Sequence, residues 1–578
     1  MSGNQETKLN NLVEWSKQQG SSIDSRVVFK YSEASGVHAI VNDDVQESFS
    51  LIQVSKNILI TPDYATDYFG VKENDPTNIN NSWLQLFVAK LKFDTNEPTI
   101  LTTDGVNCSE KWKHYIDYLP ETLNNPFWWN EDEKSLLKGT DAGILLNRQY
   151  QSLLQEWQSL ITVICQKFPN WATIGNTELA KLQGLTTSKH KLNTVTSWLS
   201  FPAYLWAANI FTSRAFPYFI INDHVKDLNQ ACLIPILDLL NHKHTAKVGW
   251  SYVDHQVNFV PKQSLKSGDE LFNNYGDKSN TGLLLGYGFV LENNEFDETF
   301  VTLKVDESQI TDAKQLGIKL PEGASSIGIN FSITNNDCLP ENLVNFFAFL
   351  VQLKSEKAMI TLRMKLDGLT QLASIINQKV EFYKTQGKIN TSMASKVSPS
   401  VIKVVKSYML CQKKLFQSCF EEIGKLEKSL LKKHKPLSFK TVLKNDKPFM
   451  NSLLLTIGVS SYDTLVKQKI VDQVFLLWVV RSVNLFNDGE KSSVKPPQFI
   501  VDEFKQVAKS IVVTKEDVLE YHPLYKTFFP SLPQKIPEIY GHGEWGIKQF
   551  IIAGTVADRV CYTRSANNEL FLLERKAV

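Results

Sequence analysis

The stretch LIPILDLLNH, from Leu233 to His242, is the starting point for interpreting this chain. Its apolar residues from Ile234 to Leu240 are typical of a buried strand or a core turn. The run then ends on two hydrogen-bonding side chains, Asn241 and His242. Taken alone, such a pair is most simply the start of a loop followed by a partly buried histidine whose hydrogen bonds are satisfied. The pair becomes informative when neighbouring segments carry matching features.

Two tyrosines beside glycines follow downstream. The segment GDELFNNYG carries Tyr275 after a short β-like stretch, and NTGLLLGYGFVLENN carries Tyr287 between two glycines. Glycines that close around a tyrosine indicate a tight backbone approach rather than core filling. Each tyrosine alone is more simply a packing residue, and Gly268-Asp269 is most simply a turn.

A third feature lies upstream, in YSEASGVHAI. It places Glu33, Ser35 and Gly36 in a small-residue turn between two predicted strands. By itself this turn is typical of an ordinary hairpin.

The pattern along the chain divides into zones. Residues 8–69 predict a short helix followed by strands in RVVFKYSE, GVHAIVN and FSLIQVSKNILITP. From about residue 82 to residue 221 the pattern is helical. Strand-like segments return between residues 232 and 303, in CLIPILDLL, GWSYV, QVNFVP and DELFNNYG, and the remainder is mostly helical. The sequence therefore predicts an α+β protein with a β-rich part, a helical insert and a helical C-terminal part.

Four helices are predicted with particular clarity. The stretch YLWAANIFTSRAF is apolar nearly all round before Arg214, which is typical of a buried helix. A second helix begins around Leu343, Phe347 and Leu350, and a long one ends at the basic residues 432–434, as suits a helix C-terminus. Apolar residues at intervals of three and four also place residues 153–168 on one face of an amphipathic helix.

Together, FPAYLWAANIFTSRAFPYF, LIPILDLLNH and NNYGDKSNTGLLLGYGFVLENNEFD resemble the SET-domain protein-lysine methyltransferases. The likeness is to the branch that includes the Rubisco large-subunit methyltransferase, and within it to fungal ribosomal-protein lysine methyltransferases. It covers residues 8–300 by motif and the remainder by architecture. The resemblance implies an N-terminal part of the SET domain over 1–81, a helical insert over 82–221, a C-terminal part with the catalytic motifs over 222–303, and a helical Rubisco-methyltransferase-like substrate-binding domain over 304–578.

The resemblance also implies a site for S-adenosylmethionine. The family's Glu-Gly-x-Gly cofactor turn matches Glu33 to Val37, with Ala34 in place of the first glycine, and the family's cofactor-binding Asn-His matches the end of the apolar run. The implied cofactor-binding residues are Glu33, Ser35, Val37, Arg214, Asn241, His242 and Tyr275.

A channel for the target lysine is implied beside the cofactor. Asp238 matches a residue whose backbone carbonyl faces the target amine, and Tyr287 matches the second aromatic wall of the channel. Tyr275 matches the characteristic SET tyrosine, so Tyr275 and Tyr287 are the expected catalytic pair. The expected channel residues are Ser213, Arg214, Asp238 and Tyr287.

The chemistry of methyl transfer fits these residue types. In-line displacement from a sulfonium to an amine needs alignment and a neutral amine. A free lysine has a pKa near ~10.4, and a desolvating apolar channel favours its neutral form. A phenol orients the amine through a hydrogen bond, and aromatic faces tolerate the cations on either side of the reaction.

Composition limits the other functions. With 62 basic and 61 acidic residues the formal net charge is +1, so no global field predicts nucleic-acid or membrane binding. Seven scattered cysteines include no CxxC motif, so neither a structural zinc nor a disulfide framework is indicated. No secretory signal and no apolar run of membrane-spanning length is visible. We therefore expect a monomeric, cytoplasmic protein, with the nucleus as a second location, that acts on a protein substrate.

Alternatives remain at the level of sequence. GHGEWG matches a dinucleotide-binding pattern but lacks a surrounding βαβ unit, and the basic stretch KLEKSLLKKHKPLSFK is more simply a solvated helix face than an RNA contact. The expected substrate is a large-subunit ribosomal protein. Cytochrome c and histones are alternatives, and an inactive SET-fold adaptor is a further one, which Ala34 favours and the intact Asn-His pair and tyrosines oppose.

Overall fold

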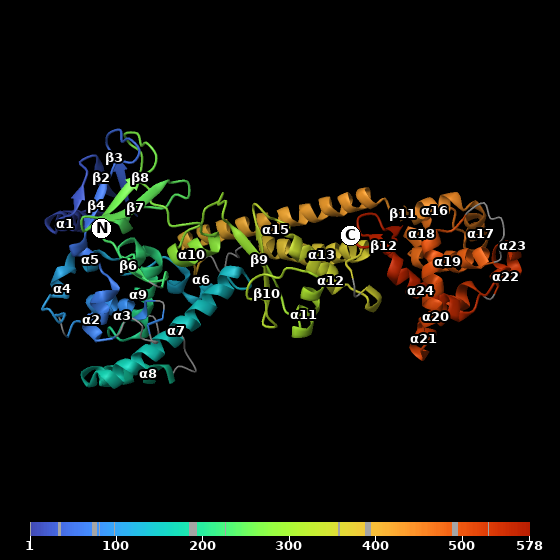
Figure 1. The fold of residues 1–578 in the computed structure, drawn as a ribbon, viewed down its shortest axis with the longest axis horizontal. Helices are drawn as coiled ribbons and strands as arrows, with labels where there is room; N and C mark the ends of the chain where they lie inside the picture. The colour runs from blue at the N-terminus through green and yellow to red at the C-terminus, as the bar shows by residue number, and fades with distance from the viewer. Residues whose placement is uncertain are drawn as a thin grey trace. The chain divides into compact units, whose positions relative to one another are not determined.

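The computed structural model describes residues 2–32, 36–71, 78–79, 81–96, 99–183, 194–225, 227–356, 359–387, 395–487, 495–529 and 531–578. The chain forms two compact units (Figure 1). Unit 1 comprises residues 1–298 and 386–411, and unit 2 comprises residues 299–385 and 412–578. The α+β fold class predicted from the sequence is confirmed.

Unit 1 holds the strands that precede and follow a helical region. Its strands are β1 (Ser22–Ile23), β2 (Val27–Ser32), β3 (Gly36–Val41), β4 (Ile52–Ser55), β5 (Ala215–Pro217), β6 (Ala231–Leu233), β7 (Val248–Val253) and β8 (Gln256–Pro261). Its helices are α1 (Ser2–Gln18), α2 (Pro62–Phe69), α3 (Ser82–Phe93), α4 (Cys108–Lys111), α5 (Lys113–Tyr118), α6 (Glu131–Ser135), α7 (Asp141–Lys167), α8 (Pro169–Gln183), α9 (Phe201–Arg214) and α10 (Asn280–Tyr287).

The sheets of unit 1 are small and antiparallel. β1, β4, β8 and β7 form one sheet in that order, β2 pairs with β3, and β5 pairs with β6. In the central pair, Ile52 lies opposite Phe259 and Val54 opposite Val257, and all four side chains are buried. Alternating residues of β8 point into the core, as expected of a sheet with one covered face.

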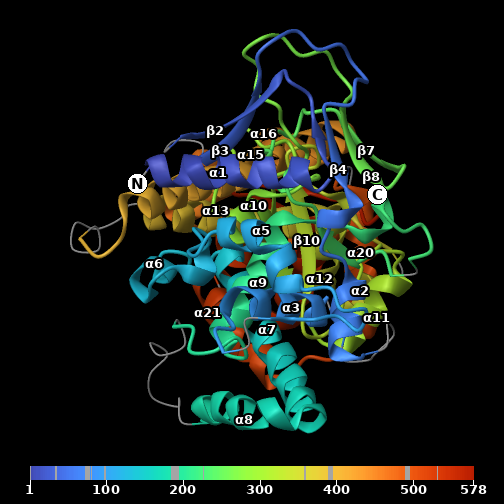
Figure 2. The same cartoon turned by 90° about the vertical axis from the view of Figure 1, so that its left-hand side faces the viewer.

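The helical region confirms the two sequence patterns that predicted it. α9 is buried along most of its length, because apolar residues surround it on every side. α7 begins at the cap residue Thr140, whose side chain accepts from the N–H of Gly143, and it buries Trp157 and Ile161 on the predicted face. α7 and α8 pack against each other, as both views show (Figures 1 and 2).

Unit 2 is mostly helical, with two small sheets, of which the sequence patterns anticipate only the strand-like region up to residue 303. β9 (Glu298–Leu303), which begins at the last residue of unit 1, pairs with β10 (Ile329–Thr334), and β11 (Leu437–Ser438), β13 (Glu569–Leu572) and β12 (Cys561–Arg564) form a three-stranded sheet in that order. The helices are α11 (Glu307–Gln315), α12 (Glu341–Leu350), α13 (Leu362–Gln386), α15 (Pro399–His434), α16 (Phe439–Asn445), α17 (Lys447–Ile457), α18 (Tyr462–Gln468), α19 (Val471–Asn487), α20 (Gln498–Ser510), α21 (Lys515–Phe528), α22 (Leu532–Lys535), α23 (Pro537–Tyr540) and α24 (Ile547–Val560).

α15 confirms the long helix predicted to end at the basic residues 432–434. Its residues up to Cys411 belong to unit 1, and the rest belong to unit 2.

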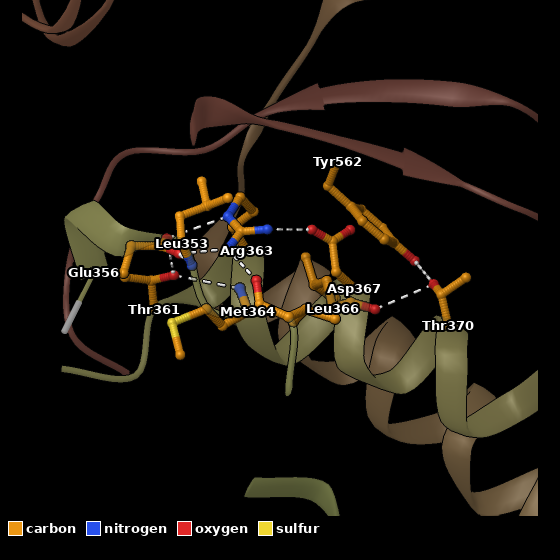
Figure 3. Close-up of polar contacts among 10 residues, drawn as sticks. Leu353, Glu356, Thr361, Arg363, Met364, Leu366, Asp367, Thr370 and Tyr562 are labelled. Carbon is orange, nitrogen blue, oxygen red and sulfur yellow. Dashed lines mark hydrogen bonds and ion pairs between the residues drawn. The ribbon is translucent and has the colours of Figure 1, made fainter. Parts of the chain in front are cut away.

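A buried ion-pair network orders the start of α13 in unit 2 (Figure 3). The guanidinium of Arg363 donates to both carboxylate oxygens of Glu356 and to Asp367. Glu356 also accepts from the hydroxyl of Thr361 and from the N–H of Leu353. The network therefore fixes the loop before α13 to the helix itself.

Two further sequence expectations have clear outcomes. The segment GHGEWG lies between α23 and α24 with no strand on either side, so it does not form a dinucleotide-binding turn. DELF of the predicted β-like segment DELFNNYG forms only isolated bridges, one of them between Ile40 and Glu270, so this strand prediction was wrong. No described helix combines the length and hydropathy that a bilayer crossing requires.

Candidate active site

The apolar run that ends at Asn241-His242 lies beside the segment that carries Tyr275. β6 ends at Leu233, and the chain then turns through a buried 3-10 turn at Leu237–Leu239. The N–H of Asn273 donates to the carbonyl of Asn241 over 2.8 Å, and His242 pairs with Asn273 in parallel register. The two motifs, thirty residues apart in sequence, therefore form one surface.

Tyr275 is held at three points. Its hydroxyl donates to the carbonyl of Leu240 over 2.8 Å, and its backbone N–H donates to Nδ1 of His242 over 3.0 Å. Its ring also stacks on the imidazole, with 4.9 Å between the centroids. Burial raises the pKa of Tyr275 to about 12, so near neutral pH the phenol is protonated and acts as a hydrogen-bond donor.

His242 is correspondingly kept neutral. Burial lowers its pKa to about 4, helped by the positive charges of His244 and Lys278. A neutral imidazole is what its contact with Tyr275 requires, because a protonated Nδ1 has no lone pair to accept the backbone N–H.

Tyr287 is the last residue of α10 and stacks on Tyr275. The ring centroids are 4.8 Å apart and the planes are inclined by 18°, which places the two rings in direct contact. Burial raises the pKa of Tyr287, with a further contribution from Tyr275. No lysine stem fits between rings at this spacing, so a channel here runs past the edges or outer faces of the pair.

Asp238 and Arg214 form a buried pair next to the tyrosines. One guanidinium nitrogen of Arg214 donates to the backbone carbonyl of Asp238 and to its Oδ2, each over 3.1 Å, and the hydroxyl of Tyr115 donates to Oδ2 over 2.9 Å. Burial raises the pKa of the Asp238 carboxyl, and Arg214 opposes that rise. The Asp238 side chain is 0% exposed although the residue as a whole is only half-buried, so its accessible surface is main chain.

The remaining predicted residues occupy distinct places. The hydroxyl of Ser213 donates to the carbonyl of Asn209 within α9, and the side-chain amide of Asn241 donates to Glu270 over 2.9 Å. Val37 lies near the start of β3. Glu33 and Ser35 lie outside the described residues.

A cavity of about 920 Å³ brings most of these groups together. It is within the size range of small-molecule sites. Its walls include Ser213, Arg214, Asp238, Tyr275 and Tyr287, all from the sequence-predicted set. Its other lining residues are Thr212, Ala215, Phe216, Pro217, His244, Thr245, Ala246, Lys247, Val248, Trp250, Asn273, Asn274, Gly276, Asp277 and Lys278.

Asn241, His242 and Val37 are not among the residues that line this cavity. His242 contacts the cavity lining through its hydrogen bond with Tyr275, and Asn241 through the N–H of Asn273.

Three residues at or beside the site were not predicted from the sequence. Tyr115, the partner of Asp238, belongs to the helical insert, and only the fold brings it to the site. Glu270 was interpreted only as part of the β-like segment that follows the Gly268-Asp269 turn. Lys278 follows Tyr275 by three residues, and this spacing was the one available hint that its side chain reaches the same cavity.

Comparisons with known proteins identify the family of the chain. Residues 298–434 match the protein family described as the EFM1 middle domain. The chain is 36% identical to the protein-lysine N-methyltransferase EFM1 of Saccharomyces cerevisiae, over 99% of each chain. It is 27% identical to ribosomal lysine N-methyltransferase 1 of the same yeast, over 89% of this chain and 92% of the relative. That second resemblance was expected from the motifs and is confirmed.

A solved structure supports the fold. The SET domain of LSMT, determined with methyllysine and AdoHcy, matches with a TM-score of 0.52 at 18% identity, over 80% of this chain and 99% of that chain. The chain belongs to the SET-domain protein-lysine N-methyltransferases of the branch that includes the Rubisco large-subunit enzyme, and its methyl donor is S-adenosylmethionine.

Proposed function

We propose that this enzyme methylates a lysine of a large-subunit ribosomal protein, as a monomer in the cytoplasm. The observation that carries the substrate is the likeness, over 89% of the chain, to a relative named for ribosomal lysine methylation. The name of the relative with 36% identity specifies protein lysine without a particular protein. The ribosomal assignment therefore rests on the second relative.

The cavity residues suit the cofactor and the target amine. When bound, S-adenosylmethionine supplies an electrophilic methyl group on a sulfonium. In our proposal, Tyr275 and Tyr287 give the amine an aromatic, desolvated approach, and the exposed main chain of Asp238 offers a carbonyl to it. Removing water lowers the pKa of the incoming lysine and favours the neutral nucleophile.

The cofactor contacts extend beyond the cavity wall. We assign Asn241 and His242 to cofactor binding together with Arg214, Val37, Glu33 and Ser35. The side-chain amide of Asn241 donates to Glu270, and this hydrogen bond also fixes the orientation of its side-chain oxygen. Arg214 is fixed by Asp238 and needs no rearrangement to present its remaining N–H groups.

Transfer of a labelled methyl group tests this function. The enzyme is incubated with labelled S-adenosylmethionine and unmethylated ribosomes, and in parallel with unmethylated cytochrome c. We expect label on one large-subunit protein. Label on cytochrome c alone would overturn the ribosomal substrate and keep lysine methylation as the reaction. No label together with no cofactor binding would favour an inactive adaptor.

A pair of tyrosine variants separates chemistry from folding. Tyr275→Phe is expected to lower the transfer rate by about a hundredfold or more, the scale of losing a positioned catalytic group. The matched control is Tyr462→Phe in unit 2, because the Tyr462 hydroxyl also donates to a backbone carbonyl, that of Asn568, over 2.9 Å. The control is expected to keep its transfer rate. Equal losses in both variants would remove the catalytic assignment of Tyr275.

A further inference from the structure

Lys278 is a cation on the cavity wall without an anionic partner among the described residues. It lines the cavity and is half-buried. Its ammonium forms no ion pair or hydrogen bond with any residue that the structure describes, and burial lowers its pKa. The neighbouring carboxylate, Asp277, also lines the cavity but is exposed and does not pair with it.

The other cationic groups of the wall differ from Lys278. Arg214 is neutralised by Asp238. His244 lies 3.7 Å from a carboxylate oxygen of Glu295. Lys247 is exposed to solvent. Lys278 is therefore the half-buried cation of the described cavity wall whose charge is left uncompensated, a costly arrangement unless a ligand supplies the anion.

The backbone around Lys278 is fixed. Its carbonyl accepts from the side-chain amide of Asn294 over 2.8 Å, and the next residue, Ser279, caps α10. Its charge also contributes to the lowered pKa of His242, the residue that supports Tyr275. Lys278 lines the same cavity as Tyr275 and Tyr287, so its charge belongs to the wall that carries the two tyrosines.

We propose that Lys278 binds a carboxylate of a ligand in this cavity. The proposal rests on the methyltransferase site proposed above and adds its anion-binding group. Two sources provide this chemistry: the amino-acid carboxylate of S-adenosylmethionine, and an acidic side chain next to the target lysine of the protein substrate. A lysine ammonium and a carboxylate form a charge-assisted hydrogen bond, which is strongest where water is excluded.

The two sources are distinguished with Lys278→Met, which keeps the length of the side chain and removes the charge. The affinities of S-adenosylmethionine and of decarboxylated S-adenosylmethionine are measured by calorimetry, and KM is measured for the ribosomal acceptor. If the cofactor supplies the carboxylate, the variant binds S-adenosylmethionine about tenfold more weakly and binds the decarboxylated form as the wild type does. If the acceptor supplies it, both cofactor affinities are kept and KM rises about tenfold.

Two further variants complete the test. Lys278→Arg restores the charge and is expected to recover the lost affinity. Lys262→Met removes an exposed lysine outside the cavity lining and is expected to change neither quantity. The cofactor measurement needs no acceptor, so it stands even if ribosomes are not labelled; the KM measurement then uses whichever protein the wild type labels in a total extract. An unchanged cofactor affinity, combined with an unchanged KM or with no labelled acceptor, overturns the proposal.

Discussion

His242 holds the backbone and ring of Tyr275 and does so only while it is neutral. Nδ1 accepts the N–H of Tyr275, and the imidazole forms one face of a stack that continues through Tyr275 to Tyr287. A single protonation therefore acts on the placement of both tyrosines. This is the physical reason for a histidine at the end of the apolar run.

The lowered pKa of His242 predicts a loss of stability in acid. The folded-state pKa of about 4 lies below the ordinary histidine value of 6.5, so the stabilising contribution is present above pH 6.5 and is lost as the pH falls toward 4. At about 1.4 kcal/mol per pKa unit, the two units between pH 6.5 and pH 4.5 correspond to about 2.8 kcal/mol, which solvent screening of this half-buried ring reduces to about 2 kcal/mol. Thermal unfolding between pH 7.5 and pH 4.5 measures it.

The control for this prediction is His242→Asn, whose side-chain oxygen accepts a hydrogen bond near the Nδ1 position and does not titrate. Carboxylates elsewhere in the chain contribute to acid unfolding of both proteins. The readout is therefore the difference in stability between the wild type and the variant. The wild type is expected to lose more stability than the variant between pH 6.5 and pH 4.5. Parallel pH profiles would show that His242 titrates normally in the folded protein.

Single residues also show what sequence reasoning reaches. The resemblance to the SET-domain enzymes placed Tyr275 and Tyr287 at one site, and the structure stacks their rings. The contact of Tyr115 with Asp238 spans 123 positions and was invisible, because no local pattern encodes which insert residue reaches the site. The spacing between the two stacked rings was equally beyond the sequence, since ring orientation depends on packing.

At the scale of elements, the caps at the two ends of α10 fix the helix that carries Tyr287. Ser279 caps the first turn by accepting from the N–H of Gly282, and the helix ends at Gly288 in the left-handed conformation, with φ of 80°. A Cβ at Gly288 would also lie 2.8 Å from the carbonyl oxygen of Asn124. The glycine after Tyr287 is therefore required by both backbone conformation and space.

Gly288→Ala is expected to destabilise unit 1 by about 2–3 kcal/mol, because it combines left-handed backbone strain with a backbone clash. Gly282→Ala in the same helix is the matched control: its Cβ meets only ordinary contacts, at 3.7 Å or more. The control is expected to be neutral or slightly stabilising. Denaturant unfolding monitors both variants, and equal stabilities would contradict the role assigned to Gly288.

Not every element was predictable from local pattern. α7 and α15 follow from their apolar periodicity, and α9 follows from a stretch that is apolar nearly all round. α10 was not predicted, because its short glycine-containing sequence has no helical face to recognise. DELF was predicted as a strand from its composition, yet its partners pair with it only at isolated positions.

In unit 2, the buried pair of Glu356 and Arg363 leads to a prediction about stability. Removing one partner of the pair should lower the free energy of unfolding more than replacing both partners. Glu356 is 1% exposed and Arg363 is 6% exposed. Burial acts to raise the pKa of Glu356, but the hydrogen bonds from Arg363, Leu353 and Thr361 and the charge of Arg363 together outweigh it, so the pKa is lowered and the carboxylate stays ionised. Arg363→Met leaves that charge buried and is expected to destabilise unit 2 by about 3–5 kcal/mol.

The double variant Glu356→Gln with Arg363→Met removes both charges and is expected to be the more stable of the two proteins. The free energy of unfolding from denaturant titration compares them with the wild type. If the single variant is the more stable one, the carboxylate of Glu356 does not depend on Arg363.

At the scale of the whole molecule, the compact units do not follow the order of the chain. Residues 386–411 return to unit 1 after a segment of unit 2. The N–H of Ser398 donates to Glu133, and the side chain of Asn130 donates to the carbonyl of Lys396. Helical periodicity predicted that this segment has an apolar face, but it does not state which part of the chain covers that face. The boundary at residue 303 therefore remains a prediction about the domains.

Tyr408 links this returning segment to α10, and its loss tests whether the segment belongs to the catalytic unit. The buried hydroxyl meets Oγ1 of Thr281 at 2.9 Å and accepts the N–H of Ala142 over 3.2 Å. Tyr408→Phe removes the hydrogen-bond partner of both groups and is expected to destabilise unit 1 by about 1–3 kcal/mol. Since Thr281 lies in the helix that carries Tyr287, the transfer rate should fall as well.

Tyr540→Phe supplies the comparison, because Tyr540 is a buried tyrosine of unit 2 whose hydroxyl meets Ser452 at 2.7 Å. It should lose similar stability and keep its transfer rate at temperatures where the protein remains folded. A fragment of residues 1–303 lacks Tyr408 altogether, so it should unfold at a lower temperature than unit 1 does in the intact chain. A fragment as stable and as active as the full chain would instead show that a catalytic unit closes at residue 303, and that residues 386–411 only rest on it.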